Sequence, residues 1–147
     1  MKNAIKGAVT VAATLLMTAT AAYASDVGVT ITNSTSTAIE DQNETCLAGG
    51  DFPATINTSA SSTVATNGAS TYYSCVVKYD RDDNSRGCKF VISRFWNVGF
   101  PPYIPGYWEV PNVTIYEDYA MNCSRTFTSI SLDASGDFDV TLTVDDQ

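Results

Sequence analysis

The amino-acid sequence predicts an all-β protein: a small antiparallel β-sandwich of about seven strands with two disulfides, and a closed β-barrel as the second architecture. Three observations support this. Apolar side chains recur at every second position in most segments, no segment after the N-terminal one has helical periodicity, and the four cysteines form an even set. Short strands with one solvated face are typical of a sandwich.

The N-terminal residues 1–24 have the pattern of a secretory signal peptide of bacterial type. Two lysines precede an apolar run over Ala8–Met17, and the small residues Ala22 and Ala24 suit the peptidase that removes such segments. The apolar run is too short to cross a bilayer core of about 30 Å. We therefore expect residues 25–147 to form a single secreted β-sandwich domain, located outside the cell or in the periplasm.

The first expected strand is Val27–Thr32, in which valine and isoleucine alternate with glycine and threonine. Residues 55–70 are nearly all Thr, Ser, Ala and Asn, which favours an exposed edge strand followed by a loop. The segments 72–79 and 88–96 flank a polar stretch and predict a hairpin at the centre of the fold. Each of these segments has one apolar face that belongs in a core.

Three further strands are expected towards the C-terminus. Residues 112–119 contain a short apolar alternation, and residues 126–132 precede a turn over 133–136 rich in Asp, Ser and Gly. The last strand, Phe138–Val144, again alternates apolar residues with Asp and Thr.

The cysteines predict two disulfides in an oxidising compartment. Two pairings fit the chain equally well: Cys46 with Cys75 and Cys88 with Cys123, or Cys75 with Cys88 and Cys46 with Cys123. Structural zinc is disfavoured because the chain has no histidine and no C-x-x-C pair.

The polar stretch inside the central hairpin partly resembles a calcium-binding loop. Asp80, Asp82 and Asn84 occupy the first three ligand positions of an EF-hand loop, but Ser85 stands where glycine is required and Val91 where glutamate is required. We expect a solvated turn, and no metal or cofactor is predicted.

Composition excludes several functions. The formal net charge is −8, and two of the eight basic residues lie in the signal segment, so nucleic acid is an unfavourable partner. Without histidine, neither a Ser-His-Asp nor a Cys-His arrangement can form. We expect no enzyme, although a carboxylate-dependent hydrolase using Glu109, Glu117 and Asp118 is a third possibility.

The segment RFWNVGFPPYIPGYW, Arg94–Trp108, is the strongest functional lead because it concentrates aromatic residues on a proline-stiffened loop. Two interpretations compete. The loop is either a recognition surface, with Phe100, Tyr103, Tyr107 and Trp108 exposed, or an aromatic lid over the open end of the sandwich. Phe95 and Trp96 continue the apolar hairpin, which favours burial of Trp96.

The segment VTITNST, Val29–Thr35, is loosely similar to the first strand of aegerolysin-like secreted sandwich proteins. This resemblance covers one strand, and neither an activity nor a residue role is carried over from it.

These observations predict an exported, non-enzymatic binding or effector module that presents its aromatic loop to a glycan, a lipid or a protein. The alternative is a subunit of a bacterial surface assembly. A monomer or small oligomer is expected, because no spare strand that could be donated to a neighbour is evident. No transmembrane segment is expected after signal cleavage.

Overall fold

A computed structural model describes residues 26–47, 49–68, 71–83, 85–100, 104–133 and 135–147. These residues form ten strands and no helix. The strands are β1 (Asp26–Asn33), β2 (Ile39–Cys46), β3 (Thr55–Ile56), β4 (Ser61–Asn67), β5 (Tyr72–Arg81), β6 (Gly87–Asn97), β7 (Tyr107–Trp108), β8 (Asn112–Glu117), β9 (Met121–Ile130) and β10 (Phe138–Asp146).

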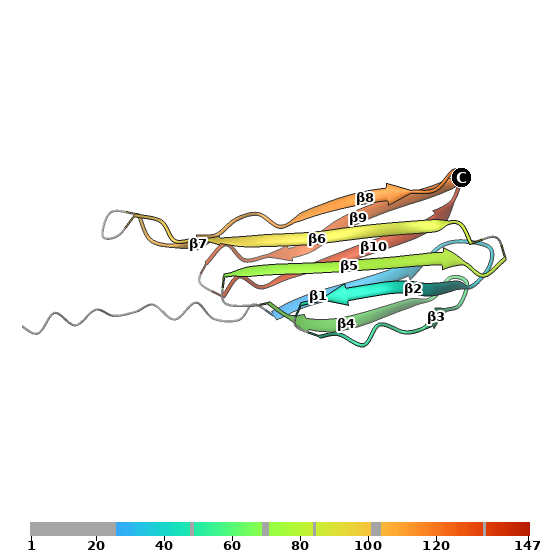
Figure 1. The fold of residues 1–147 in the computed structure, drawn as a ribbon, viewed down its shortest axis with the longest axis horizontal. Helices are drawn as coiled ribbons and strands as arrows, with labels where there is room; N and C mark the ends of the chain where they lie inside the picture. Colours follow the sequence, from blue (N-terminus) through green and yellow to red (C-terminus); the bar gives the residue numbers. More distant parts are fainter. Residues whose placement is uncertain (1–25, 48, 69–70, 84, 101–103, 134) are drawn as a thin grey trace, which may run out of the picture.

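The strands form two sheets that pack face to face and do not close into a barrel (Figure 1). Sheet A has the order β4-β1-β10-β9, and sheet B has the order β3-β2-β5-β6, with β7 and β8 both paired to β6. The predicted sandwich is therefore confirmed. One pair departs from the antiparallel pattern: β1 and β10 run parallel, with Val27 opposite Phe138.

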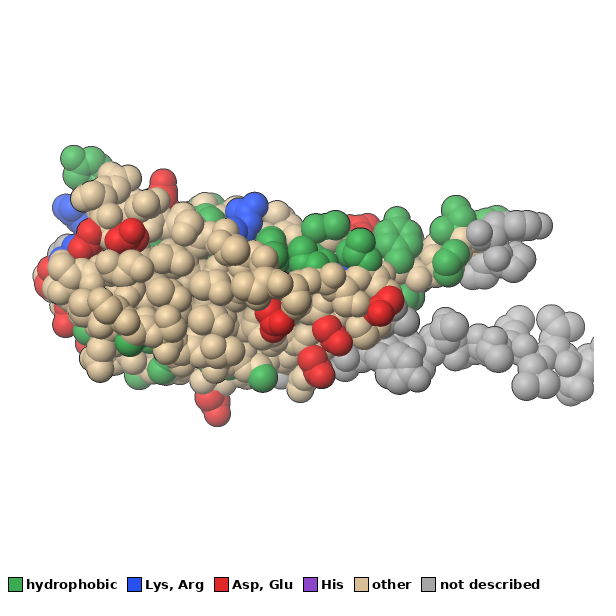
Figure 2. All heavy atoms as spheres, turned by 180° about the vertical axis from the view of Figure 1, so that it is seen from behind, with side chains coloured by type: hydrophobic (Ala, Val, Ile, Leu, Met, Phe, Trp, Pro, Cys, Tyr) green, Lys and Arg blue, Asp and Glu red, His purple; other side chains and the backbone are tan. Residues whose placement is uncertain are grey.

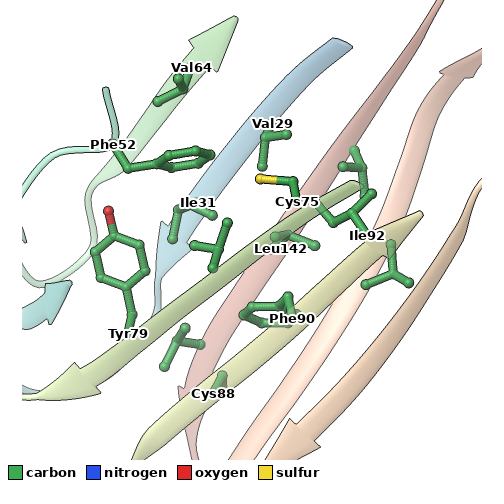
Figure 3. Packing of buried hydrophobic residues seen from close by; sticks show 14 of the residues in the cluster. Val29, Ile31, Phe52, Val64, Cys75, Tyr79, Cys88, Phe90, Ile92 and Leu142 are labelled. Atoms are coloured by element: carbon green, nitrogen blue, oxygen red, sulfur yellow. The ribbon is translucent and has the colours of Figure 1, made fainter. Parts of the chain in front are cut away.

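The core lies between the two sheets and is built from the alternating apolar residues (Figure 3). Sheet A contributes the inward faces of β1 and β10, and sheet B contributes those of β5 and β6, as the alternation predicted. Burying one such side chain fully stabilises the fold by about 1.5–3 kcal/mol. The fully buried members include Val29, Ile31, Cys75, Val77, Tyr79, Cys88, Phe90, Ile92, Leu142 and Val144.

The four cysteines pair in sequence order, which is the first of the two pairings that the sequence allows. Cys46–Cys75 links β2 to its neighbour β5 within sheet B, whereas Cys88–Cys123 links β6 of sheet B to β9 of sheet A. No cysteine is free among the residues that the structure describes. Both bridges indicate an oxidising environment outside the cytoplasm.

β2 is the main strand that the sequence did not predict. Its residues are mostly polar, Ile39 is its one fully buried side chain, and its pairing with β5 is interrupted by a bulge between Asp41 and Asn43. Backbone pairing and the Cys46–Cys75 disulfide, not an apolar face, hold it in the sheet. The Thr- and Ser-rich segment behaves as expected, because β4 lies at the edge of sheet A.

The sandwich is elongated, and β6 runs along it from one end to the other (Figure 1). The turn between β5 and β6 lies at one end, which we call the far end. Residues beyond the C-terminal part of β6 project from the opposite end. In the described part of the chain, no helix is long and apolar enough to span a membrane.

Candidate functional site: an apolar arm at the end of the sandwich

The projecting segment is a two-stranded extension of β6 and β7, which we call the arm (Phe95–Trp108). Trp96 pairs with Trp108 at its base. Further out, Phe100 and Ile104 exchange two backbone hydrogen bonds of 2.9 Å each. Gly99 has a φ of 67°, and a Cβ there would collide with the backbone of the returning strand, so only glycine fits this position. The arm is thus a continuation of the hairpin ladder.

The outer part of the arm exposes apolar side chains to solvent (Figure 2). No Asp, Glu, Lys or Arg occurs between Phe95 and Trp108. The predicted candidates Phe100 and Tyr107 are exposed, and Tyr103 lies outside the described residues. The exposed fractions are 55% for Phe95, 70% for Val98, 66% for Phe100, 52% for Ile104 and 43% for Tyr107.

The expectation that Trp108 is exposed is wrong. Trp108 is 0% exposed, because neighbours on a strand point to opposite sides and Tyr107 takes the outer one. The Trp108 indole packs on Gly136, and its ring centroid lies 5.6 Å from that of Trp96 in an edge-to-face arrangement. Trp96 itself is only half-buried. The base of the arm is therefore a lid over the sandwich, whereas its outer part is exposed to solvent.

Arg94, at the start of the arm, anchors this lid and was not recognised from the sequence. It is 1% exposed, and its Nε donates to the carbonyl oxygen of Glu109 at 2.7 Å. Its two terminal nitrogens donate to the carbonyl oxygens of Gly136 and Ser131. The guanidinium carbon also lies 5.6 Å from the centre of the Trp108 ring. Arg94 therefore joins the arm to the turn between β9 and β10.

Burial disfavours the charged form of Arg94. Removal from water lowers the pKa of the guanidinium, and the negative charges of Asp137 and Asp133 oppose this effect. The sequence did carry a signal for this residue: Arg94 falls on the same period-two face of β6 as Phe90 and Ile92, both fully buried. A charged residue in that position has to find acceptors inside the protein.

Five exposed carboxylates surround the base of the arm, and we call them the collar. They come from β1, β10, the turn before β10 and the residue after β7. Asp137 accepts a hydrogen bond from the backbone nitrogen of Asp26 at 2.9 Å. Hydrogen bonds from Ser131 and Ser135 hold the pKa of Asp133 at about 2, so this group stays charged. The members are Asp26, Glu109, Asp133, Asp137 and Asp139.

An open groove of about 520 Å³ lies beside the collar on the outer face of sheet A. Gly28 lies in this groove between the paired residues Ala65 and Asp139, and a Cβ on Gly28 would collide with the Asp139 side chain. The carboxylates of Asp26 and Asp137 lie in the same groove. Three of the five collar carboxylates therefore line this groove.

The structure does not bring together the carboxylates considered for hydrolysis. Glu109 lies at the base of the arm, next to Phe95, whereas Glu117 and Asp118 lie at the far end. There, Glu117 accepts from the backbone nitrogen of Cys123 at 3.3 Å and Asp118 from that of Gly87 at 3.0 Å. Both carboxylates therefore stabilise nearby backbone through hydrogen bonds.

The turn considered for calcium is also engaged in local contacts. Asp80 is buried and forms an ion pair with Lys78 at 2.8 Å, and Arg81 donates to Asp83 and Asp146. Asn84 lies outside the described residues. No group of three or more metal-ligating side chains occurs where the structure describes the chain.

Comparison with known proteins supports the fold. No protein-family model matches the chain, and no curated protein does so either. The crystal structure of IP-1A from Alcaligenes faecalis is similar, with a TM-score of 0.52, 14% identity, and coverage of 86% of this chain and 94% of IP-1A. The lipid binding protein Nakanori has a TM-score of 0.50 and 10% identity, over 82% of this chain and 70% of Nakanori. At such identities the likeness concerns the sandwich fold alone.

Proposed function

We propose that this protein is an exported, non-enzymatic binding module whose arm enters the interfacial layer of a lipid membrane. The observation that carries the proposal is the arm itself: a backbone-paired, projecting, uncharged extension whose outer side chains are apolar and exposed. Apolar surface gains free energy when it leaves water, and aromatic side chains favour the boundary between headgroups and acyl chains. Such an element needs a partner that accepts it.

A membrane fits the shape of the arm better than a protein or a glycan does. Stable protein interfaces bury about 800 Å² on each partner, and a two-stranded tip offers a narrow surface for this. Sugar recognition needs polar groups beside a stacking ring, whereas Val98, Phe100 and Ile104 are apolar. Nakanori, one of the proteins with a similar fold, is a lipid binding protein, which supports the same choice.

The proposal extends to location and assembly. Two disulfides and the signal-like N-terminus support a secreted or periplasmic protein of bacterial type. Both β1 and β10 are already paired inside sheet A, which supports a monomer or small oligomer over an assembly subunit that borrows a strand. Filaments of purified protein in electron micrographs would favour the assembly alternative.

The test compares the unaltered protein with a Phe100→Ser, Ile104→Ser double variant in co-sedimentation with phosphatidylcholine vesicles. Phe100 is 66% exposed and Ile104 is 52% exposed. Moving these exposed surfaces from water into the membrane should therefore gain about two-thirds and about half, respectively, of the free energy of burying each side chain fully. Together this gives about 2–3 kcal/mol, and the variant should bind roughly 30- to 150-fold more weakly. Its melting temperature should stay unchanged, because both side chains face water.

The matched control is Tyr119→Ser, which removes an aromatic side chain that is 85% exposed at the far end. It should leave vesicle binding unchanged. An equal loss in both variants, or no binding of the unaltered protein to any vesicle, would refute the membrane assignment. Binding to an immobilised glycan or protein instead, lost in the arm variant alone, would keep the arm as the site and change its partner.

A further inference from the structure

We propose that the collar makes the arm selective for membranes that carry no net negative charge. The inference rests on the proposed entry of the arm into a membrane. It concerns a different set of residues, the five carboxylates behind the arm, and it specifies which lipid surfaces the protein accepts.

The basic residues are distributed unevenly along the sandwich, whereas acidic residues lie at both ends. All six basic residues after the signal segment are described, and four of them, Lys78, Arg81, Arg86 and Lys89, lie on β5, β6 or their turn at the far end. Arg125 lies within β9, opposite Leu142. The remaining one, Arg94, is at the base of the arm, but it is buried and its nitrogens are bonded to backbone carbonyls. It offers nothing to a lipid phosphate, so the surface around the arm is acidic.

The length of the arm brings this acidic surface within electrostatic reach of a bilayer. Four strand positions separate the Trp96–Trp108 pair from the Phe100–Ile104 pair, or about 13 Å at 3.3 Å per residue. Interfacial elements enter the headgroup boundary by about 5–10 Å. Collar residues near the base then lie within about one Debye length, ~10 Å in 0.1 M salt, of the membrane surface.

The sign of the interaction follows from these positions. Anionic lipids give a leaflet a negative surface potential, which repels the collar while the apolar tip is being inserted. A zwitterionic leaflet imposes no such penalty, and a cationic leaflet attracts the collar. Binding should therefore fall as anionic lipid is added, by roughly tenfold when about a quarter of the lipid is phosphatidylserine.

A triple variant, Asp26→Asn, Glu109→Gln and Asp139→Asn, tests this directly. None of the three carboxylates is buried, and Asn at 139 can still accept the hydrogen bond that Asp139 receives from Ser129. No substituted residue belongs to the arm's apolar surface. The matched control removes the same charge at the far end: Glu40→Gln, Asp82→Asn and Asp145→Asn.

The experiment measures partition of the three proteins onto vesicles of phosphatidylcholine alone, with added phosphatidylserine, and with an added cationic lipid. We expect equal binding to phosphatidylcholine, a roughly tenfold loss on the anionic vesicles for the unaltered and control proteins, and a loss of about two- to threefold for the collar variant, which keeps two of the five charges. Cationic lipid should strengthen binding of the unaltered protein more than that of the collar variant.

The outcomes separate this inference from the proposed function. If phosphatidylcholine binds the arm but phosphatidylserine has no effect, or has the same effect on the collar and control variants, the collar is not the determinant and the membrane assignment stands. Absence of binding to all three vesicle types overturns both.

Discussion

Trp108 gives the sharpest test of the observed geometry, because it was expected at the surface and lies in the interior. Replacing it by Ala removes a fully buried indole that fills the space between Gly136, Trp96 and the guanidinium of Arg94. Truncating a buried tryptophan costs about 3–5 kcal/mol, through lost contacts and the cavity that remains. Domains of this size are stable by about 5–15 kcal/mol, so the loss is a large share.

The neighbouring residue supplies the comparison. Tyr107 is 43% exposed, and its hydroxyl accepts a hydrogen bond from Asn97 at 3.3 Å. Tyr107→Ala should therefore lower the free energy of unfolding by less than about 1 kcal/mol. Trp108→Phe should be far milder than Trp108→Ala. Phe retains a ring, and it removes the indole Nε1, a buried donor for which the structure shows no acceptor.

Thermal unfolding followed by far-ultraviolet circular dichroism measures all three variants without depending on tryptophan emission. Trp108→Ala should lower the melting temperature by roughly 10–20 °C, and Tyr107→Ala by a few degrees at most. Equal, small effects of Trp108→Ala and Tyr107→Ala would show that the indole is not packed as described and would reinstate Trp108 as a surface residue.

Three other predictions concern the disulfides, the anchor and a buried phenol. A thiol reagent should label no cysteine in the native protein, and a Cys88→Ala, Cys123→Ala variant should lose about 2–4 kcal/mol of unfolding free energy in urea. Arg94→Lys should lower the free energy of unfolding by about 2–3 kcal/mol and speed up amide hydrogen exchange in the turn after β9. The reason is that one ammonium cannot replace the separate hydrogen bonds of the guanidinium. Unchanged exchange in that turn would contradict the role of Arg94 as an anchor. Burial raises the pKa of Tyr73 to about 12, above the ordinary value of 10, so its contribution to stability is complete below pH 10 and is lost between about pH 10 and 12. The Tyr73→Phe variant should lack that part of the alkaline loss, seen by phenolate absorbance and urea midpoints.

The parts of the fold that sequence predicted correctly are those in which one face of a strand is buried. Residues 27–31 and 138–144 alternate because inward side chains are apolar and outward ones are solvated. The same rule explains the omission of β2, whose side chains lie mostly at the surface while its backbone pairs with β5. Alternation also carries no information on which strands are neighbours, so the parallel pairing of β1 with β10 was not foreseen.

The candidate site was predictable in position but not in orientation. Composition located the arm, and Phe100 and Tyr107 are exposed as expected, although their role in binding stays a prediction. Trp108 was misassigned because the loop was treated as one surface, whereas its returning strand again points alternate side chains inward and outward. Arg94 was overlooked although its place on the inward face of β6 was visible in the alternation; only its partners, backbone carbonyls of a turn distant in sequence, could not be predicted from a residue pattern.

The parallel pair at the middle of sheet A has a consequence for how the chain folds. β1 and β10 are the first and last strands of the described chain, and the hydrogen bond that joins Asp26 to Asp137 spans 111 positions. The β5–β6 hairpin closes over a short turn and can form early, but β1 and β9 have no central partner until β10 has emerged. A chain shortened by this one strand would leave two unpaired edges open to other molecules. We therefore expect sheet A to be completed only when residues 138–146 have joined β1 to β9.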